Sequence, residues 1–104
     1  DPMPVLRNLD TPQLWILGAE DRDAAPVETA ARLAELTRTG RPITTAIFPG
    51  AEHGMALFET AADGTRLATR QPAGYFPMMR DFIRRRRVGP VSDYGAVAPT
   101  PKRD

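Results

Sequence analysis

The chain has 104 residues, enough for one small domain and too few for two. Its hydrophobic content of 41% excludes a fully disordered chain, and 14 Lys and Arg against 13 Asp and Glu argue against an extended nucleic-acid surface. The sequence has no cysteine and a single histidine, His53, which excludes disulfides, a thiolate nucleophile and a histidine-rich metal site. No apolar run reaches the roughly 18 residues that a transmembrane helix requires.

The first predicted strand covers residues 13–17. Residues 1–10, which precede it, are expected to form a short helix or turn. The apolar run ends at Gly18, and its length and bulk are typical of a strand that is buried on both faces of a parallel sheet. We interpret Trp15 as a core side chain of this strand rather than as the wall of a pocket. The polar residues 18–25 predict a loop.

The clearest helix signal covers residues 26–39. Pro26 suits the first helical position, and Glu28 complements the positive end of the helix dipole. Gly40 can supply the left-handed residue that ends the helix. We expect the buried face of this helix to be an apolar stripe at helical spacing, made of Ala30, Leu33, Ala34 and Leu36.

A second strand is predicted over residues 43–48, where the sequence is apolar and rich in β-branched side chains. Pro49 and Gly50 end this strand, and the loop that follows holds His53. A strand, a helix and a strand at this spacing predict a right-handed crossover between two parallel strands.

The next segment predicts a β-hairpin. Residues 55–60 and 65–70 have strand-like composition, and Asp63-Gly64 between them favours a tight turn.

The C-terminal part predicts a closing helix over residues 74–87 and a flexible or loosely packed tail over residues 89–104. The run Arg84–Arg87 is best explained as a solvated helix end, where basic side chains complement the helix dipole. One helix face is expected to carry the apolar residues, with the first two in the core against the sheet: Tyr75, Met79, Phe82 and Ile83.

These elements together indicate an α/β fold. Two parallel strands and two helices are few for a parallel-sheet domain, because such sheets need more strands and cover on both faces. We therefore expect residues 1–88 to be the C-terminal portion of a larger α/β sheet. Unpaired strand edges invite pairing, so we also expect the isolated chain to self-associate.

Two chemically active side chains follow the two parallel strands. Asp21 lies in the loop after the first strand, and His53 lies in the loop after the second. Since reactive groups of open α/β sheets gather at the carboxyl ends of the strands, one crossover brings the acid and the imidazole to the same edge. A carboxylate that orients an imidazole is two thirds of a nucleophilic triad.

The same two loops resemble a known superfamily. The segment Trp15–Asp21, with Pro26 just beyond it, resembles the Gly-x-x-Asp loop after the penultimate core strand of the α/β-hydrolases. The segment Phe48–Gly54 resembles the histidine loop after their last core strand. The likeness is to the branch of dienelactone hydrolases and prolyl-oligopeptidase-type peptidases and esterases. It covers residues 11–54 well and the closing helix more loosely.

The resemblance implies a serine hydrolase of esters or amides, with Asp21 and His53 as triad members and no cofactor or metal. Asp23 is the alternative acid, because this loop is one residue longer before its proline than the commonest form. The superfamily's Gly-x-Ser-x-Gly elbow is not in this sequence, and the single serine, Ser92, lies in the predicted tail. The resemblance therefore implies a C-terminal fragment whose nucleophile and oxyanion hole lie upstream, and which is inactive alone.

Two other functions compete with this hypothesis. One is a small free-standing α/β binding or structural domain in which Asp21 and His53 have no catalytic role. The other is an adaptor for anionic partners that binds through Arg84–Arg87. The cysteine count fits either the cytoplasm or the periplasm.

Overall fold

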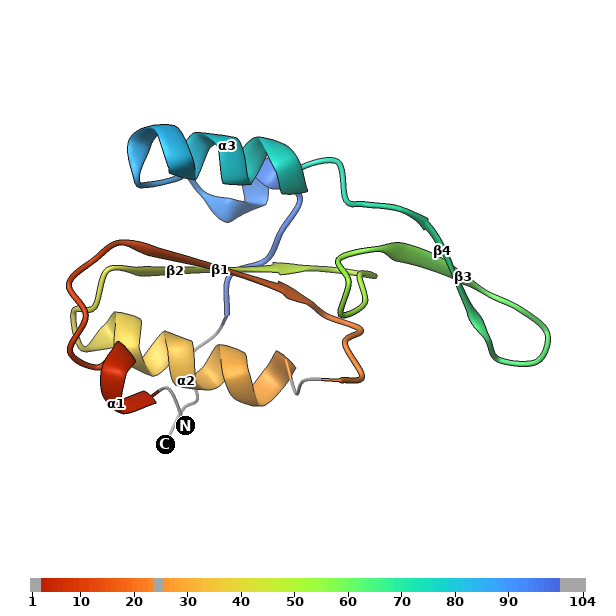
Figure 1. The fold of residues 1–104 in the computed structure, drawn as a ribbon, viewed down its shortest axis with the longest axis horizontal. Coiled ribbons are helices and arrows are strands. Elements are labelled where there is room, and N and C mark those ends of the chain that lie inside the picture. The colour runs from red at the N-terminus through yellow and green to blue at the C-terminus, as the bar shows by residue number, and fades with distance from the viewer. Residues whose placement is uncertain (1–2, 24–25, 100–104) are drawn as a thin grey trace.

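The computed structural model describes residues 3–23 and 26–99. A two-stranded parallel sheet lies between a helix layer on each side, and a hairpin projects from one end of it (Figure 1). The elements in chain order are α1 (Met3–Leu6), β1 (Gln13–Gly18), α2 (Pro26–Arg38), β2 (Ile43–Phe48), β3 (Leu57–Thr60), β4 (Arg66–Arg70), α3 (Tyr75–Arg85) and the 3₁₀ helix η1 (Val91–Tyr94).

The predicted parallel pair is present. β1 and β2 run parallel in continuous register from Gln13 opposite Ile43 to Gly18 opposite Phe48. Both faces of β1 are covered, yet its residues 13–17 are only partly buried rather than fully buried as expected. The reason is that, within the described residues, β1 is hydrogen-bonded to β2 alone, so its other edge has no strand beside it.

One face of this sheet is covered by α2. Glu28 occupies the first turn of α2 and Arg38 the last, as the helix dipole favours. Gly40 follows with a φ of 96°, the left-handed conformation that ends the helix. The predicted stripe is confirmed, because the four buried residues of the helix are Ala30, Leu33, Ala34 and Leu36.

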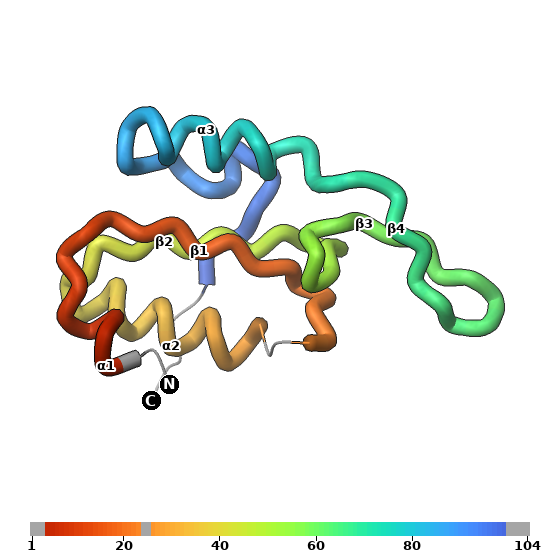
Figure 2. The backbone as a smooth tube through the Cα atoms, in the orientation of Figure 1, coloured from red at the N-terminus to blue at the C-terminus, as the bar shows by residue number. Residues whose placement is uncertain are grey.

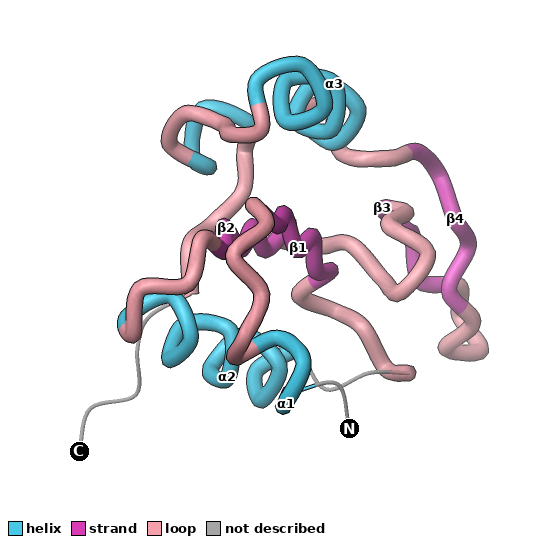
Figure 3. The backbone as a smooth tube through the Cα atoms, turned by 60° about the vertical axis from the view of Figure 1, so that its left-hand side comes forward, coloured by secondary structure: helices cyan, strands magenta, loops and turns pink. Residues whose placement is uncertain are grey.

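The opposite face is covered by α3 and by the segment after it, as the turned view makes plain (Figure 3). Its core gathers side chains from four separate parts of the chain: β2, the His53 loop, α3 and the residues after η1. The buried members are Ala46, Phe48, Ala51, Met55, Met78 and Ala96.

The face that α3 buries differs from the predicted one. Met78 is fully buried and Ile83 is 79% exposed, whereas the prediction placed Met79 in the core and Ile83 on the same face. Tyr75 does pack against the core, as expected. The start of α3 lies directly against η1, because a Cβ on Gly74 would lie 1.8 Å from the carbonyl oxygen of Tyr94. Met78 lies three residues after Tyr75, on the same side of the helix, and both pack in the core on the α3 face.

The predicted hairpin forms from β3 and β4, which pair antiparallel (Figure 2). Asp63 Oδ1 accepts a hydrogen bond from the Thr65 N–H at 2.9 Å, and Gly64 has a φ of 87°. These are the two features that an Asp-Gly turn supplies. The Thr65 bonds lower the pKa of the Asp63 carboxyl.

Part of the expected tail makes ordered contacts with the core. Val97 and Ile47 exchange backbone hydrogen bonds of 2.8 and 2.9 Å, so the chain pairs antiparallel with the outer edge of β2. Tyr94 in η1 donates a hydrogen bond to Asp81 Oδ2 at 2.6 Å. The low apolar content of the segment gave no sign of this packing, in which Ala96 is buried and Val91 and Tyr94 pack against the core. Residues 100–104 of the predicted tail lie outside the described residues.

Among the described residues, no helix has the length and apolar character needed to cross a membrane.

Candidate functional site

Two loops meet at one edge of the sheet. The acid loop follows β1 and holds Asp21, and the histidine loop follows β2 and holds His53. A Cβ on Gly18 would lie 2.5 Å from the carbonyl oxygen of Ala51, so only glycine permits this approach. The same oxygen accepts a hydrogen bond of 2.9 Å from the backbone N–H of Glu20. The backbone therefore joins the acid loop directly to the histidine loop, without any side chain between them.

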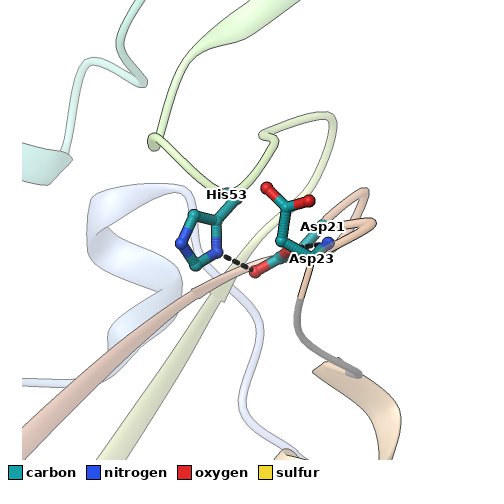
Figure 4. A group of neighbouring side chains, drawn as sticks. All are labelled: Asp21, Asp23 and His53. Atoms are coloured by element: carbon teal, nitrogen blue, oxygen red, sulfur yellow. Dashed lines mark hydrogen bonds and ion pairs between the residues drawn. The ribbon is translucent and has the colours of Figure 1, made fainter.

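Asp21 and His53 are hydrogen-bonded to each other. His53 Nδ1 lies 2.8 Å from Asp21 Oδ2 (Figure 4). The side chain of Asp21 is only 10% exposed, whereas that of His53 is 60% exposed. The carboxylate is thus shielded behind the imidazole, and the ring is open to a reacting group.

The bond determines which ring nitrogen is free. An ionised carboxylate only accepts, so a neutral His53 carries its proton on Nδ1 and leaves Nε2 as the basic atom. The Asp21 hydrogen bond and, next, the Asp21 charge raise the pKa of His53 above its ordinary value of 6.5. Both effects favour the imidazolium, which a general base must become when it takes up a proton.

Asp23 contacts Asp21 through its backbone. The backbone N–H of Asp23 donates at 2.8 Å to Asp21 Oδ1, the carboxylate oxygen that His53 does not bond. The structure thus places Asp21 against the imidazole ring, and places Asp23 as its neighbour. The Asp23 charge makes the smallest of the contributions that raise the pKa of His53.

The same three side chains could in principle offer ligands to a cation. One atom each of Asp21, Asp23 and His53 lies within 4.8 Å of the others. However, Asp21 Oδ2 and His53 Nδ1 are already bonded to each other, and gathered acidic groups are common without an ion. We therefore interpret the group as a hydrogen-bonded pair and assign no metal to it.

The other residues singled out in the sequence lie away from this pair. Trp15 packs in the core on the α2 face, as predicted. Ser92 lies in η1 and is exposed, and within the described residues His53 bonds Asp21 and not Ser92. Arg84 and Arg85 fill the last turn of α3, and Arg86 ends it with a φ of 58°, all exposed to solvent. This is the geometry of a solvated helix end.

One residue at the site was not foreseen. Arg66, from β4 of the hairpin, reaches the acid loop and donates from Nη1 to the Glu20 carbonyl oxygen at 2.6 Å. Its side chain is 15% exposed, which is low for an arginine. No sequence pattern marks it, because the contact depends on how the hairpin is placed relative to the sheet.

The family model of the prolyl oligopeptidase family matches residues 1–70. The chain belongs to the prolyl oligopeptidase family. The family is one of hydrolases in the α/β-hydrolase superfamily, and the matched region contains both strands, both loops and the hairpin. Comparisons with curated proteins and with solved structures give no match.

Proposed function

We propose that this chain supplies the acid and the general base of a serine hydrolase, Asp21 and His53, and that the nucleophilic serine and the oxyanion hole lie upstream in a longer protein. The observation that carries the proposal is the 2.8 Å bond between a shielded Asp21 carboxylate and an exposed His53 imidazole. The order of acid before histidine, each after a parallel strand, and membership of a hydrolase family support it.

The mechanism follows from the free nitrogen of the ring. As a serine hydroxyl attacks the carbonyl carbon of an ester or peptide substrate, His53 Nε2 takes the hydroxyl proton. Asp21 stabilises the imidazolium that results and keeps the ring in one tautomer. The imidazolium then gives the proton to the leaving alcohol or amine. Water repeats the cycle on the acyl-enzyme, with His53 again as the base.

The isolated chain is expected to be inactive on this proposal. Its single serine, Ser92, is not bonded to His53 in the described part of the chain. Without a nucleophile there is no covalent catalysis, so activated esters should be hydrolysed no faster than by free imidazole.

The test is fluorophosphonate labelling of two proteins, this chain and the longest reading frame that contains it. We expect labelling of the longer protein only, and its loss on His53→Ala. Asp21→Asn should slow labelling by about 10⁴-fold, because an amide favours the wrong tautomer of the histidine. Asp23→Asn is the matched control and should retain most of the rate. A folded longer protein that does not label would leave the alternative, a small α/β binding or structural domain.

Self-association is a separate proposal about the isolated chain. Within the described residues β1 pairs on one side only, and an open strand edge is a template for another chain. We expect a concentration-dependent dimer in sedimentation experiments. A strictly monomeric species at high concentration would contradict this expectation.

A further inference from the structure

The β3–β4 hairpin contacts both loops that carry the proposed catalytic pair. It projects from the sheet at the edge where those loops lie (Figure 1). On the histidine side, Ala51 forms a β-bridge with Leu57, and the Glu52 N–H donates to the Ala56 carbonyl oxygen at 3.0 Å. The start of β3 is therefore fastened by backbone bonds to the residues immediately before His53.

On the acid side the connection is one side chain, Arg66. Its Nη1 donates at 2.6 Å to the backbone carbonyl of Glu20, the residue immediately before Asp21. Its Nη2 lies 3.9 Å from Glu20 Oε2, a longer and weaker contact. A charge-assisted bond to a backbone carbonyl restrains the main chain itself, and so restrains the direction in which the Asp21 side chain leaves it.

The guanidinium is itself held in place. Its central carbon lies 4.3 Å from the centre of the Phe58 ring, on the neighbouring strand. Stacking on Phe58 and low exposure limit the rotamers open to Arg66, so the donor approaches Glu20 from a fixed direction. The hairpin thereby presents a rigid donor rather than a mobile surface cation.

We propose that Arg66 is a positioning residue that locks the acid loop to the histidine loop through the hairpin, and so holds Asp21 against His53. The catalytic meaning of this inference rests on the proposed function, whereas the geometric claim concerns this chain alone. Arg66 acts through the backbone of Glu20, to whose carbonyl oxygen it donates.

Two possible roles of Arg66 predict opposite signs. The charges that act on His53 are those of Asp21 and Asp23 on the acid loop, and Glu52 precedes it in the chain. Arg66 contacts the acid loop at Glu20. If Arg66 acted only as a nearby positive charge, removing it would raise the pKa of His53. If it positions Asp21, removing it loosens the hydrogen bond to Nδ1 and lowers the pKa of His53 toward 6.5.

The experiment is an NMR titration of His53, the single histidine of the chain, so its imidazole signals need no assignment by mutation. Arg66→Ala should lower the His53 pKa, and Arg66→Lys, which retains a donor without the planar fork, should lower it less. Arg70→Ala, an exposed arginine on the same strand, is the matched control and should leave it unchanged. An unchanged or raised pKa in Arg66→Ala would overturn the proposal.

A further pair of variants separates this inference from the proposed function. Asp21→Asn should bring the His53 pKa close to its ordinary value. If Asp21→Asn has no effect, the pair itself does not form and the proposed function fails. If Asp21→Asn lowers the pKa and Arg66→Ala does not, only the positioning role fails. Should Arg66→Ala not fold, Phe58→Leu removes the stacking partner while keeping the arginine, and the same direction of change is expected.

Discussion

The two faces of the β1–β2 sheet are built in different ways. The α2 face is packed by Leu33 and Leu36 of α2, Ile43 of β2 and Leu6 of α1, the short helix just before β1. The α3 face draws Phe48, Met55, Met78 and Ala96 from segments far apart in the chain. The first face is therefore formed by the crossover and the short helix just before it, whereas the second requires segments far apart in the chain to dock. The histidine loop belongs to the second face, since Ala51 and Met55 on either side of His53 lie in its core.

The greatest loss of stability is expected when a fully buried side chain on either face is replaced by alanine. Leu33 is 1% exposed and Met78 is fully buried, so replacing either by alanine should cost about 2–5 kcal/mol of unfolding free energy. Only Met78→Ala should also move the His53 resonances, because only its face contains the histidine loop. Urea unfolding and ¹H–¹⁵N spectra measure the two effects. If the His53 resonances shift equally in both variants, the two faces do not differ in their connection to the histidine loop.

A smaller effect is expected where the two loops touch. Gly18→Ala places a Cβ about 2.5 Å from a carbonyl oxygen of the histidine loop, so the loops must separate. Overpacking of this kind costs about 1–3 kcal/mol. We also expect the pKa of His53 to fall, because Asp21 moves away with the acid loop. Gly54→Ala, where a Cβ would meet nothing, is the control for alanine in this region.

The unfolding free energy should depend on pH through His53, whose loop packs on the α3 face. The folded-state pKa of His53 is raised by Asp21, so its stabilising contribution is complete below pH 6.5 and is lost as the pH rises through the folded value. Unfolding free energy should therefore fall as the pH increases above 6.5, and Asp21→Asn should flatten the curve. Asp63 and Asp81 do not interfere, since their lowered pKa values place their titration in acid.

The smallest effect is expected on the outer surface of α2. Glu28 and Arg32 form an exposed pair four residues apart, with side chains 65% and 54% exposed. Breaking it by Glu28→Gln should cost no more than about 0.5 kcal/mol. The cost should shrink further in high salt, as measured by urea unfolding at two ionic strengths. A larger cost would mean that the α2 layer depends on its surface as well as on its buried stripe.

The contrast between the faces explains what the sequence could predict. The α2 stripe, both ends of β2 and the Asp63-Gly64 turn were predicted because each is encoded by neighbouring residues. The placement of Asp21 near His53 followed from the parallel crossover alone. These features depend on periodicity and turn chemistry, which a single sequence displays.

The features that escaped prediction are contacts between distant segments. The burial of Met78 rather than Met79 depends on how α3 docks against β2 and Ala96. The Arg66 contact with Glu20 depends on the angle at which the hairpin leaves the sheet. Neither quantity leaves a periodic trace in the sequence, because tertiary packing determines both.

The Val97–Ile47 pairing has a consequence for assembly. It covers the outer edge of β2 at Ile47 as an isolated bridge, and Pro99, two residues further on, has no N–H with which to extend that pairing. Within the described residues, the other edge of β1 has no strand beside it at any position. Two copies that pair through their β1 edges use the same edge on each copy, so they form a closed two-fold pair. Pairing of this kind leaves neither β1 edge free to accept a third copy.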